Sequence, residues 1–379
     1  MTYQEIANET EGLLTKNTGW IDRYSGYYDD IKANEAYVEV VCKYIDPPYP
    51  LKKYLSIGLV KDAKNKVTID LRVIGHSIAA VIVDLNPELK KQIEDKIKTG
   101  LKDKIHSRAR VHFKKSGMEL VAENSSDKDA FENETKALYA DPENNIWEWN
   151  SNEVQEFFSF IKKCGFRINS EHTVETLLLD ELSKKLSTDK YIKMIQPCTI
   201  CDQYYQLVTP LKASEAKNDM ISYSKDKNGI DRKGGGIDIL AHIKRGNLGE
   251  ICVIELKDKY ETNETPAKAI KQAIAYATFI IKLIRCREAQ GDSWYEFFEM
   301  NKSRLTEKPL KVNAVIAMPY PDENDPGKLG KEDTSFVGET VNVDGDIIEL
   351  HYIYFKTEAL KTAHVEKGIT TSLKIPQSE

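Results

Sequence analysis

The chain has 379 residues, of which 41% are hydrophobic and 30% are charged, and its formal net charge is -6 at pH 7. This is the composition of an ordinary globular protein that is long enough for two domains, and it excludes a chain that binds nucleic acid through net charge alone. The N-terminus lacks a signal segment, and the most apolar runs, SIAAVIV and AIAYATFIIKLI, are too short to cross a bilayer. We therefore expect a cytoplasmic protein with no membrane partner.

Residues 1–122 predict an α+β domain for sensing, specificity or assembly. A helix is expected from Asn86 to Lys104, with Pro87 in its first turn. Runs rich in β-branched residues predict strands on either side of it, at 35–45, 54–60, 66–74, 77–85 and 108–113. The stretch 90–115 carries ten Lys or Arg residues against three acids. Such a face can contact phosphates or can simply be solvated, and the sequence leaves both open.

Residues 123–169 predict an acidic linker followed by a helix. The segment ELVAENSSDKDAFENETKALYADPENN is strongly acidic and contains Ser, Asn and Pro, which is typical of a boundary between domains. The run NEVQEFFSFIKKCGF, at 152–166, has the spacing of a helix.

Residues 170–379 predict a second domain whose elements alternate between helices and strands. A helix is expected at 170–186 and a strand at 203–211, followed by a β-hairpin and a long helix from Thr265 to Arg287. Further strands are expected at 311–319 and 346–355. The fold class is therefore α/β (α+β), with a mixed central sheet flanked by helices and an additional N-terminal α+β domain.

The six cysteines are scattered along the chain, which favours reduced thiols over a disulfide framework. Cys198 and Cys201 form a CxxC pair, but a structural zinc needs two more ligands, and no second pair follows at a suitable spacing. Ordinary thiols are the favoured interpretation, and zinc is the alternative.

Three charged residues interrupt the hairpin GGGIDILAHIKRGNLGEICVIELKDKY. Gly246 and Asn247 suit a two-residue turn, which would place Asp238 directly across from Glu255, with their Cβ atoms roughly 5 Å apart. Lys257 lies two residues further along and points to the same face as Glu255. The other face carries apolar residues that suit a core: Ile239, Ala241, Ile243, Cys252 and Ile254.

Two carboxylates this close repel each other unless a cation lies between them. Oxygen ligands favour Mg²⁺ or Mn²⁺, and such an ion lowers the pKa of a bound water and stabilises charge on a phosphoryl oxygen. Lys257 could orient that water or neutralise the developing charge. The alternative is a cross-strand ion pair between Lys257 and an acid at the end of a sheet.

These residues resemble the PD-(D/E)xK nuclease superfamily, with a restriction-endonuclease-like core. The match consists of Gly-Ile-Asp at 236–238, Glu-Leu-Lys at 255–257 and Gln272-Ala-Ile-Ala-Tyr276, and it covers about residues 170–320. GGGIDIL is similar to the glycine-rich acidic strand of Mrr-type restriction enzymes, and QxxxY is similar to a helix of RecB-like nucleases. Ile237 stands where the family has proline.

The resemblance implies roles for individual residues. Asp238 and Glu255 would be metal ligands, and Lys257 the catalytic lysine. Gln272 and Tyr276 would be accessory catalytic residues on one helix face. Glu175 would add a third acid from the first helix, although Glu171 and Glu181 compete for that place.

The resemblance therefore implies a Mg²⁺-dependent DNA endonuclease, in restriction or antiviral defence, with Mn²⁺ as an alternative ion. RNA is not excluded as a substrate, and we expect a homo-oligomer, with an activating partner protein as a further option. The alternative from another class is a nucleic-acid-binding or scaffolding protein on a nuclease fold that no longer cleaves.

Overall fold

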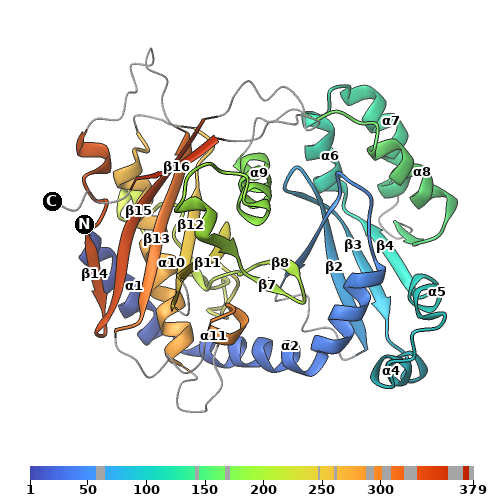
Figure 1. Ribbon diagram of the computed structural model, residues 1–379, viewed down its shortest axis with the longest axis horizontal. Coiled ribbons are helices and arrows are strands. Elements are labelled where there is room, and N and C mark those ends of the chain that lie inside the picture. Colours follow the sequence, from blue (N-terminus) through green and yellow to red (C-terminus); the bar gives the residue numbers. More distant parts are fainter. Residues whose placement is uncertain are drawn as a thin grey trace.

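The computed structural model describes residues 1–56, 65–140, 145–166, 171–245, 248–259, 263–286, 294–300, 309–319, 331–356 and 370–374. The protein is a mixed α/β structure with two seven-stranded mixed sheets flanked by helices (Figure 1). This agrees with the α/β (α+β) class expected from the sequence.

The N-terminal sheet has the strand order β5-β4-β3-β2-β1-β8-β7. Its strands are β1 (Lys52–Ser56), β2 (Lys66–Val73), β3 (His76–Asp84), β4 (Ala109–Phe113), β5 (Ile146–Glu148), β7 (Thr199–Ile200) and β8 (Gln203–Gln206). The helices of this region are α2 (Gly19–Tyr44), α4 (Pro87–Glu94), α5 (Leu101–His106), α6 (Lys115–Asn124), α7 (Lys128–Tyr139) and α8 (Asn152–Ile161). The strands expected at 66–74, 77–85 and 108–113 are thus confirmed, and the expected strand at 54–60 is described only as far as residue 56.

Two predictions for this region are wrong. The expected strand at 35–45 is the last part of α2, because its buried residues Val38, Val41 and Cys42 recur at helical spacing. The expected helix from Asn86 to Lys104 is split into α4 and α5. Asn86 does cap α4, since its side chain accepts a hydrogen bond from the Leu89 amide at 2.8 Å. The break follows from the left-handed backbone of Lys96 and Gly100.

The acidic segment expected as a linker is folded. It contains α6 and α7, and β5 pairs with β4. The Asp127 side chain caps α7 through the Ala130 amide at 3.0 Å, and Phe131 and Leu138 are buried. The acids that suggested a linker therefore lie on the outside of an amphipathic helix.

The C-terminal sheet has the order β14-β15-β13-β12-β11-β6, with β16 also paired to β15. Its strands are β6 (Ile195–Pro197), β11 (Ile239–Arg245), β12 (Leu248–Leu256), β13 (Lys311–Pro319), β14 (Thr340–Val343), β15 (Asp346–Lys356) and β16 (Thr370–Lys374). Helix α9 (Glu171–Lys184) covers one face, and α10 (Pro266–Arg285) covers the other, where α1 (Tyr3–Lys16) packs against it (Figure 1). The short helix α11 (Trp294–Phe297) and a two-stranded sheet of β9 (Leu211–Lys212) and β10 (Ser222–Tyr223) complete this half.

The register of the β11–β12 hairpin confirms the pairing expected from the sequence. Arg245 pairs with Leu248 and Ile239 with Ile254, so Asp238 and Glu255 are the next opposing positions. The turn residues Gly246 and Asn247 lie outside the described residues. The apolar face of the hairpin is buried against α9, as expected, and its members cluster together: Ile239, Ala241, Ile243, Cys252 and Ile254.

The two halves exchange chain segments. The expected strand at 203–211 does not enter the C-terminal sheet. Its first part is β8, which pairs in parallel with β1, and β6 takes the edge position beside β11. Figure 1 shows α2 running beneath both halves. The predicted domains 1–122 and 170–379 therefore share a sheet and a helix.

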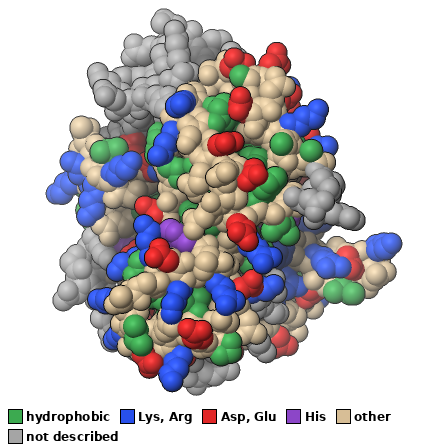
Figure 2. All heavy atoms as spheres, turned by 90° about the vertical axis from the view of Figure 1, so that its right-hand side faces the viewer, with side chains coloured by type: hydrophobic (Ala, Val, Ile, Leu, Met, Phe, Trp, Pro, Cys, Tyr) green, Lys and Arg blue, Asp and Glu red, His purple; other side chains and the backbone are tan. Residues whose placement is uncertain are grey.

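Surface charge on the N-terminal half is mixed. Figure 2 shows Lys and Arg side chains interspersed with Asp and Glu side chains on this face. Within the basic stretch, Lys104 lies 3.5 Å from Glu88, and Lys114 lies 2.6 Å from Asp70. This pattern supports the solvated face rather than a phosphate-binding face. No helix among the described residues is long and apolar enough to cross a membrane.

An aromatic cluster joins the first helices to the C-terminal half. The ring of Phe279 in α10 lies 5.7 Å from Trp20 and 5.1 Å from Tyr24 in α2, and Trp294 lies 6.2 Å from Tyr24. All four side chains are buried. Because α2 also packs under the N-terminal sheet, this cluster ties the stability of both halves together.

We expect Phe279→Ala to destabilise the whole protein by about 3–5 kcal/mol, because it leaves a cavity in this cluster. Urea unfolding followed by far-UV and near-UV circular dichroism should show one transition at a lower midpoint. Ile146→Ala, at a side chain that is 51% exposed, is the control and should change stability by less than about 0.5 kcal/mol. A biphasic curve, in which one half keeps its wild-type midpoint, would contradict the shared core.

Candidate functional site

The two acids of the hairpin lie where β11 begins and β12 ends. The Asp238 carboxylate accepts a hydrogen bond from the Leu256 amide at 2.8 Å, which fixes it beside the end of β12. Glu255 is the last but one residue of β12 and is 1% exposed. Its Oε2 accepts a hydrogen bond from Gln272 Nε2 at 2.8 Å, whereas its Oε1 is buried and has no hydrogen-bond partner among the residues that the structure describes.

Helices from both faces of the sheet reach this strand end. Lys257 Nζ lies 3.3 Å from Gln272 Oε1 on α10 and 3.4 Å from Glu171 Oε1 on α9. Gln272 therefore bridges Glu255 and Lys257 through the two ends of its amide. The sequence-predicted residues Asp238, Glu255, Lys257 and Gln272 are thus brought together.

The acids of α9 differ in their surroundings. Glu175 is buried and makes a 3.3 Å contact with His172 Nδ1, and its charge acts on Asp238. Glu171 contacts Lys257 instead. Glu181 lies further along α9 and is also buried. Glu175 is therefore placed near Asp238, as the resemblance implied, and Glu171 is a second acid at the site.

Tyr276 lies one turn after Gln272 on α10 and is 1% exposed. A Cβ added to Gly235 would lie 2.1 Å from its hydroxyl, so only glycine lets the backbone before Asp238 pass this ring. Burial raises the pKa of Tyr276, which keeps the phenol protonated. Tyr276 thus supports the segment that carries Asp238.

The electrostatics of the site favour an added cation. Burial, and then the charge of Glu175, raise the pKa of Asp238 to about 7. Burial, and then Asp238, raise the pKa of Glu255 well above its ordinary value. Burial by itself lowers the pKa of Lys257, but the charges of Glu171, Glu255 and Asp238 outweigh this and raise it. One lysine therefore does not compensate four neighbouring carboxyl groups.

These donors fit a hard divalent ion. The orphaned Oε1 of Glu255 and the raised pKa of Asp238 are both signs of acids that lack a positive partner. In the described parts of the chain, no three His, Cys, Asp or Glu side chains converge on one metal position. Mg²⁺ commonly keeps several waters and takes only one or two carboxylates, so Asp238 and Glu255 suit it better than a structural zinc.

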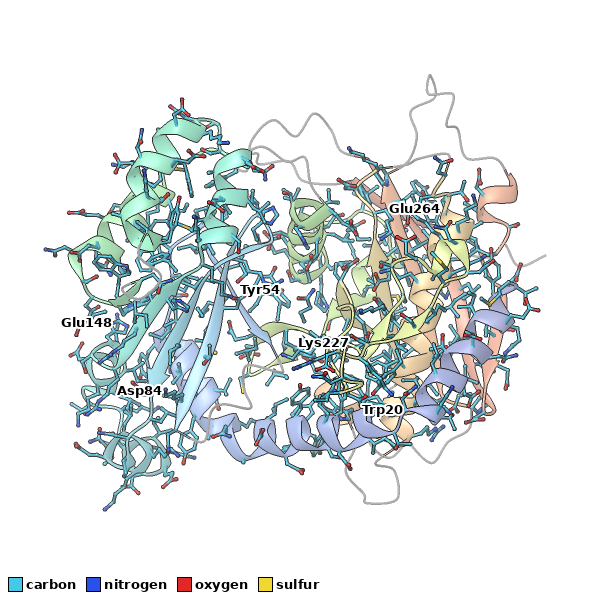
Figure 3. All side chains as sticks on the ribbon, turned by 180° about the vertical axis from the view of Figure 1, so that it is seen from behind. Trp20, Tyr54, Asp84, Glu148, Lys227 and Glu264 are labelled. Carbon is cyan, nitrogen blue, oxygen red and sulfur yellow. The ribbon has the colours of Figure 1, made fainter. Side chains whose placement is uncertain are left out.

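The N-terminal sheet contributes residues to the site that sequence reasoning missed. A small cavity is lined by Tyr54 of β1 and Gln206 of β8 together with Glu175 and Asp238. Figure 3 shows Tyr54 on the side of its sheet that faces the other half. Tyr54 and Gln206 reach the site because β8 pairs with β1 of the N-terminal sheet, and no local sequence pattern predicts this pairing.

Arg72 links this edge to the N-terminal sheet. It follows a β-bulge, and its guanidinium lies 4.6 Å from the Tyr54 ring. Its Nη2 donates to Gln206 Oε1 at 3.2 Å, and its Nε donates to Asp70 Oδ2 at 2.9 Å. Gln206 in turn packs against Gly236, where an added Cβ would lie 2.9 Å from its amide nitrogen.

A pair of histidines beside the site, His76 and His172, was also not predicted from the sequence. His172 of α9 faces His76 of β3, with ring centroids 5.3 Å apart. The hydrogen bond with Glu175 raises the pKa of His172, whereas burial, and then His172, lower the pKa of His76 to about 4. A single histidine before Thr-Val-Glu in the sequence gives no indication of such a pair.

Cys198 and Cys201 lie in different surroundings despite their CxxC spacing. Cys198 is buried, with Sγ 3.7 Å from His242 Nδ1, whereas Cys201 Sγ donates to the Glu35 carbonyl at 3.4 Å. All six cysteines are free thiols.

The chain matches no protein-family model, no curated protein and no solved structure. The assignment of a function therefore depends on the geometry above.

We expect Asp238→Asn to stabilise the metal-free protein at pH 8. A carboxyl group whose pKa is higher in the folded than in the unfolded chain binds more protons when folded, so it costs stability as the pH rises from about 4 to about 7. The amide cannot ionise, so the variant should gain roughly 4 kcal/mol at pH 8, about 1.4 kcal/mol for each unit by which the pKa is raised, and almost nothing at pH 4. Urea unfolding in EDTA at both pH values measures this. Asp95→Asn, at an exposed acid, should show no such gain, and a destabilised Asp238→Asn at pH 8 would contradict the electrostatic description.

We also expect Gly236→Ala to displace the Gln206 side chain and break its hydrogen bond to Arg72. The single substitution should cost about 1 kcal/mol. Gln206→Ala removes the obstructing atoms, so the double variant should be more stable than the sum of the two single effects predicts. A double-mutant cycle by urea unfolding measures this coupling, and strictly additive effects would show that the two positions do not interact.

Proposed function

We propose that the protein is a Mg²⁺-dependent DNA endonuclease with a restriction-endonuclease-like core, acting in restriction or antiviral defence. The observation that carries this proposal is the strand end where the buried Glu255 lies beside Asp238 and is bridged by Gln272 to Lys257. Among the elements of the C-terminal sheet and the two helices α9 and α10 that cover it, the chain order α9, β6, β11, β12, α10, β13 supports the same core.

Asp238 and Glu255 are the residues that would hold the ion, and Glu175 is the third candidate. Bound there, a divalent cation would lower the pKa of a water and polarise a phosphoryl oxygen. Mn²⁺ offers similar chemistry with the same oxygen ligands.

Lys257 supplies positive charge at the position where a phosphodiester would meet these acids. Its ammonium is held by Glu171 and Gln272, so it is oriented before substrate arrives. Pre-oriented charge of this kind stabilises negative charge that develops on phosphoryl oxygens. Gln272 keeps the Glu255 carboxylate and this ammonium in a fixed relation, and Tyr276 supports the backbone before Asp238.

The experiment is cleavage of supercoiled plasmid, linear duplex and single-stranded DNA with Mg²⁺, Mn²⁺ or EDTA. We expect metal-dependent nicking by the wild type, which would distinguish an endonuclease from an exonuclease. Asp238→Asn, Glu255→Gln and Lys257→Met should each lower the rate by at least about 100-fold, because each removes a group that contacts the ion or the developing charge. Lys259→Met, at an exposed lysine two residues beyond Lys257, is the matched control and should keep wild-type activity.

Activity that is retained in all three site variants would refute the proposal. Metal-independent binding without cleavage in any condition would favour the non-cleaving nucleic-acid-binding protein. Parallel assays on RNA of the same sequence decide between the two nucleic acids as substrate.

A further inference from the structure

Residues 222–233 form a largely exposed turn on the surface, which we call the basic hairpin. It contains four cations against two acids. Its backbone is closed by a bridge between Lys225 and Asp231 and by hydrogen bonds from the Asp226 amide to the Ile230 carbonyl and from the Arg232 amide to the Ser224 carbonyl, both 2.8 Å long. The shape is thus set before any partner arrives.

Both acids of the basic hairpin, Asp226 and Asp231, accept hydrogen bonds from groups within the hairpin. Asp226 Oδ1 accepts from the Asn228 and Ile230 amides at 2.8 and 3.0 Å, and its Oδ2 accepts from Arg232 at 2.9 Å. Asp231 accepts from the Tyr223 hydroxyl at 3.0 Å. The acids therefore shape the turn and do not neutralise its lysines.

The three lysines of the basic hairpin lie on the surface, and the Lys225 ammonium lies 5.7 Å from the centroid of the Tyr223 ring. Lys225, Lys227 and Lys233 are exposed, and none forms an ion pair with the part of the chain that the structure describes. Ile230, at the tip, is 57% exposed.

The basic hairpin is joined to the candidate site by a short chain segment. Four residues separate Lys233 from Asp238, so their Cα atoms, five steps apart along the chain, lie within about 18 Å of each other. The connecting glycines are tightly held, since the Gly234 amide donates to the Thr209 carbonyl at 2.7 Å and the Gly235 amide to the Leu211 carbonyl at 2.6 Å. Figure 3 shows Lys227 between the two halves of the molecule, on the side seen from behind.

We propose that the basic hairpin binds the phosphate backbone of duplex DNA beside the cleavage site. Duplex DNA carries one negative charge per about 1.7 Å of its axis, so a duplex lying over Asp238 would meet Lys233 within about 18 Å and could continue along the rest of the basic hairpin. The positive charge of the basic hairpin complements the DNA phosphates locally. A chain of net charge -6 could therefore bind DNA at this place. This inference deepens the proposed function and rests on it for the position of the DNA.

The test is fluorescence anisotropy of a 30-base-pair DNA duplex with the full-length protein between 50 and 200 mM salt, with Ca²⁺ in place of Mg²⁺. The triple variant Lys225→Gln, Lys227→Gln and Lys233→Gln should bind more than tenfold more weakly at 100 mM salt. The slope of log K against log salt should fall in magnitude by about 2–3, because each phosphate contact contributes about 0.9. Thermal stability should stay at the wild-type value, since the three side chains are exposed.

The matched control replaces three exposed lysines near α4 and α5, far from the site: Lys91→Gln, Lys98→Gln and Lys102→Gln. It carries the same change in net charge and should keep the wild-type affinity and slope. Equal effects of the two triple variants would overturn the basic hairpin as a specific contact, and so would equal or tighter binding of duplex RNA of the same length.

The two proposals can fail separately. A wild type that cleaves DNA while the hairpin variant binds normally refutes only the DNA contact of the basic hairpin. A wild type that binds through the basic hairpin but never cleaves refutes only the nuclease. A wild type that neither binds nor cleaves DNA refutes both.

Discussion

The central constraint in this protein is the burial of carboxyl groups at the end of the β11–β12 hairpin. Asp238 and Glu255 are forced together by the strand register, and burial removes the water that would otherwise solvate their charges. Such an arrangement costs several kcal/mol unless a positive partner is supplied. Several surrounding residues hold these two acids in place despite the free-energy cost of burying their charges.

Several contacts hold the acids from different directions. The Leu256 amide fixes Asp238, and Gln272 on α10 fixes Glu255. Lys257 connects α10 to Glu171 of α9 across the strand end. A site that is built from two helices and two strands on opposite faces of a sheet has little freedom to relax its charges apart. Under the proposed function, this geometry would be in place before a cation and a phosphodiester bind.

The exchange of β7 and β8 makes the N-terminal sheet part of the same construction. Gln206 ends β8 and packs against Gly236, and Tyr54 of β1 lines the cavity beside Glu175. Helix α2, which has 26 residues and is about 39 Å long, connects the aromatic cluster around Phe279 to the underside of the N-terminal sheet. Packed contacts thus connect the N-terminal sheet to the segment that carries Asp238.

The sequence by itself determined the local features of the site. The alternation of the hairpin and its register predicted that Asp238 would lie across from Glu255, because strand pairing has a period of two and depends only on neighbouring residues. The helical spacing of Gln272 and Tyr276 likewise placed both on one face of α10. Strands and caps with strong local signals, such as β2, β3 and the Asn86 cap of α4, were also predictable.

Only the tertiary structure decided how distant segments combine. Residues 203–206 could have paired with either sheet, and they join β1 because long-range pairing is chosen by the whole core and not by local preference. The acidic segment is folded because its apolar residues, Phe131 and Leu138 among them, are buried in the core. Arg72, Tyr54 and Gln206 come from sequence positions far from Asp238, so their place at the site follows from packing alone.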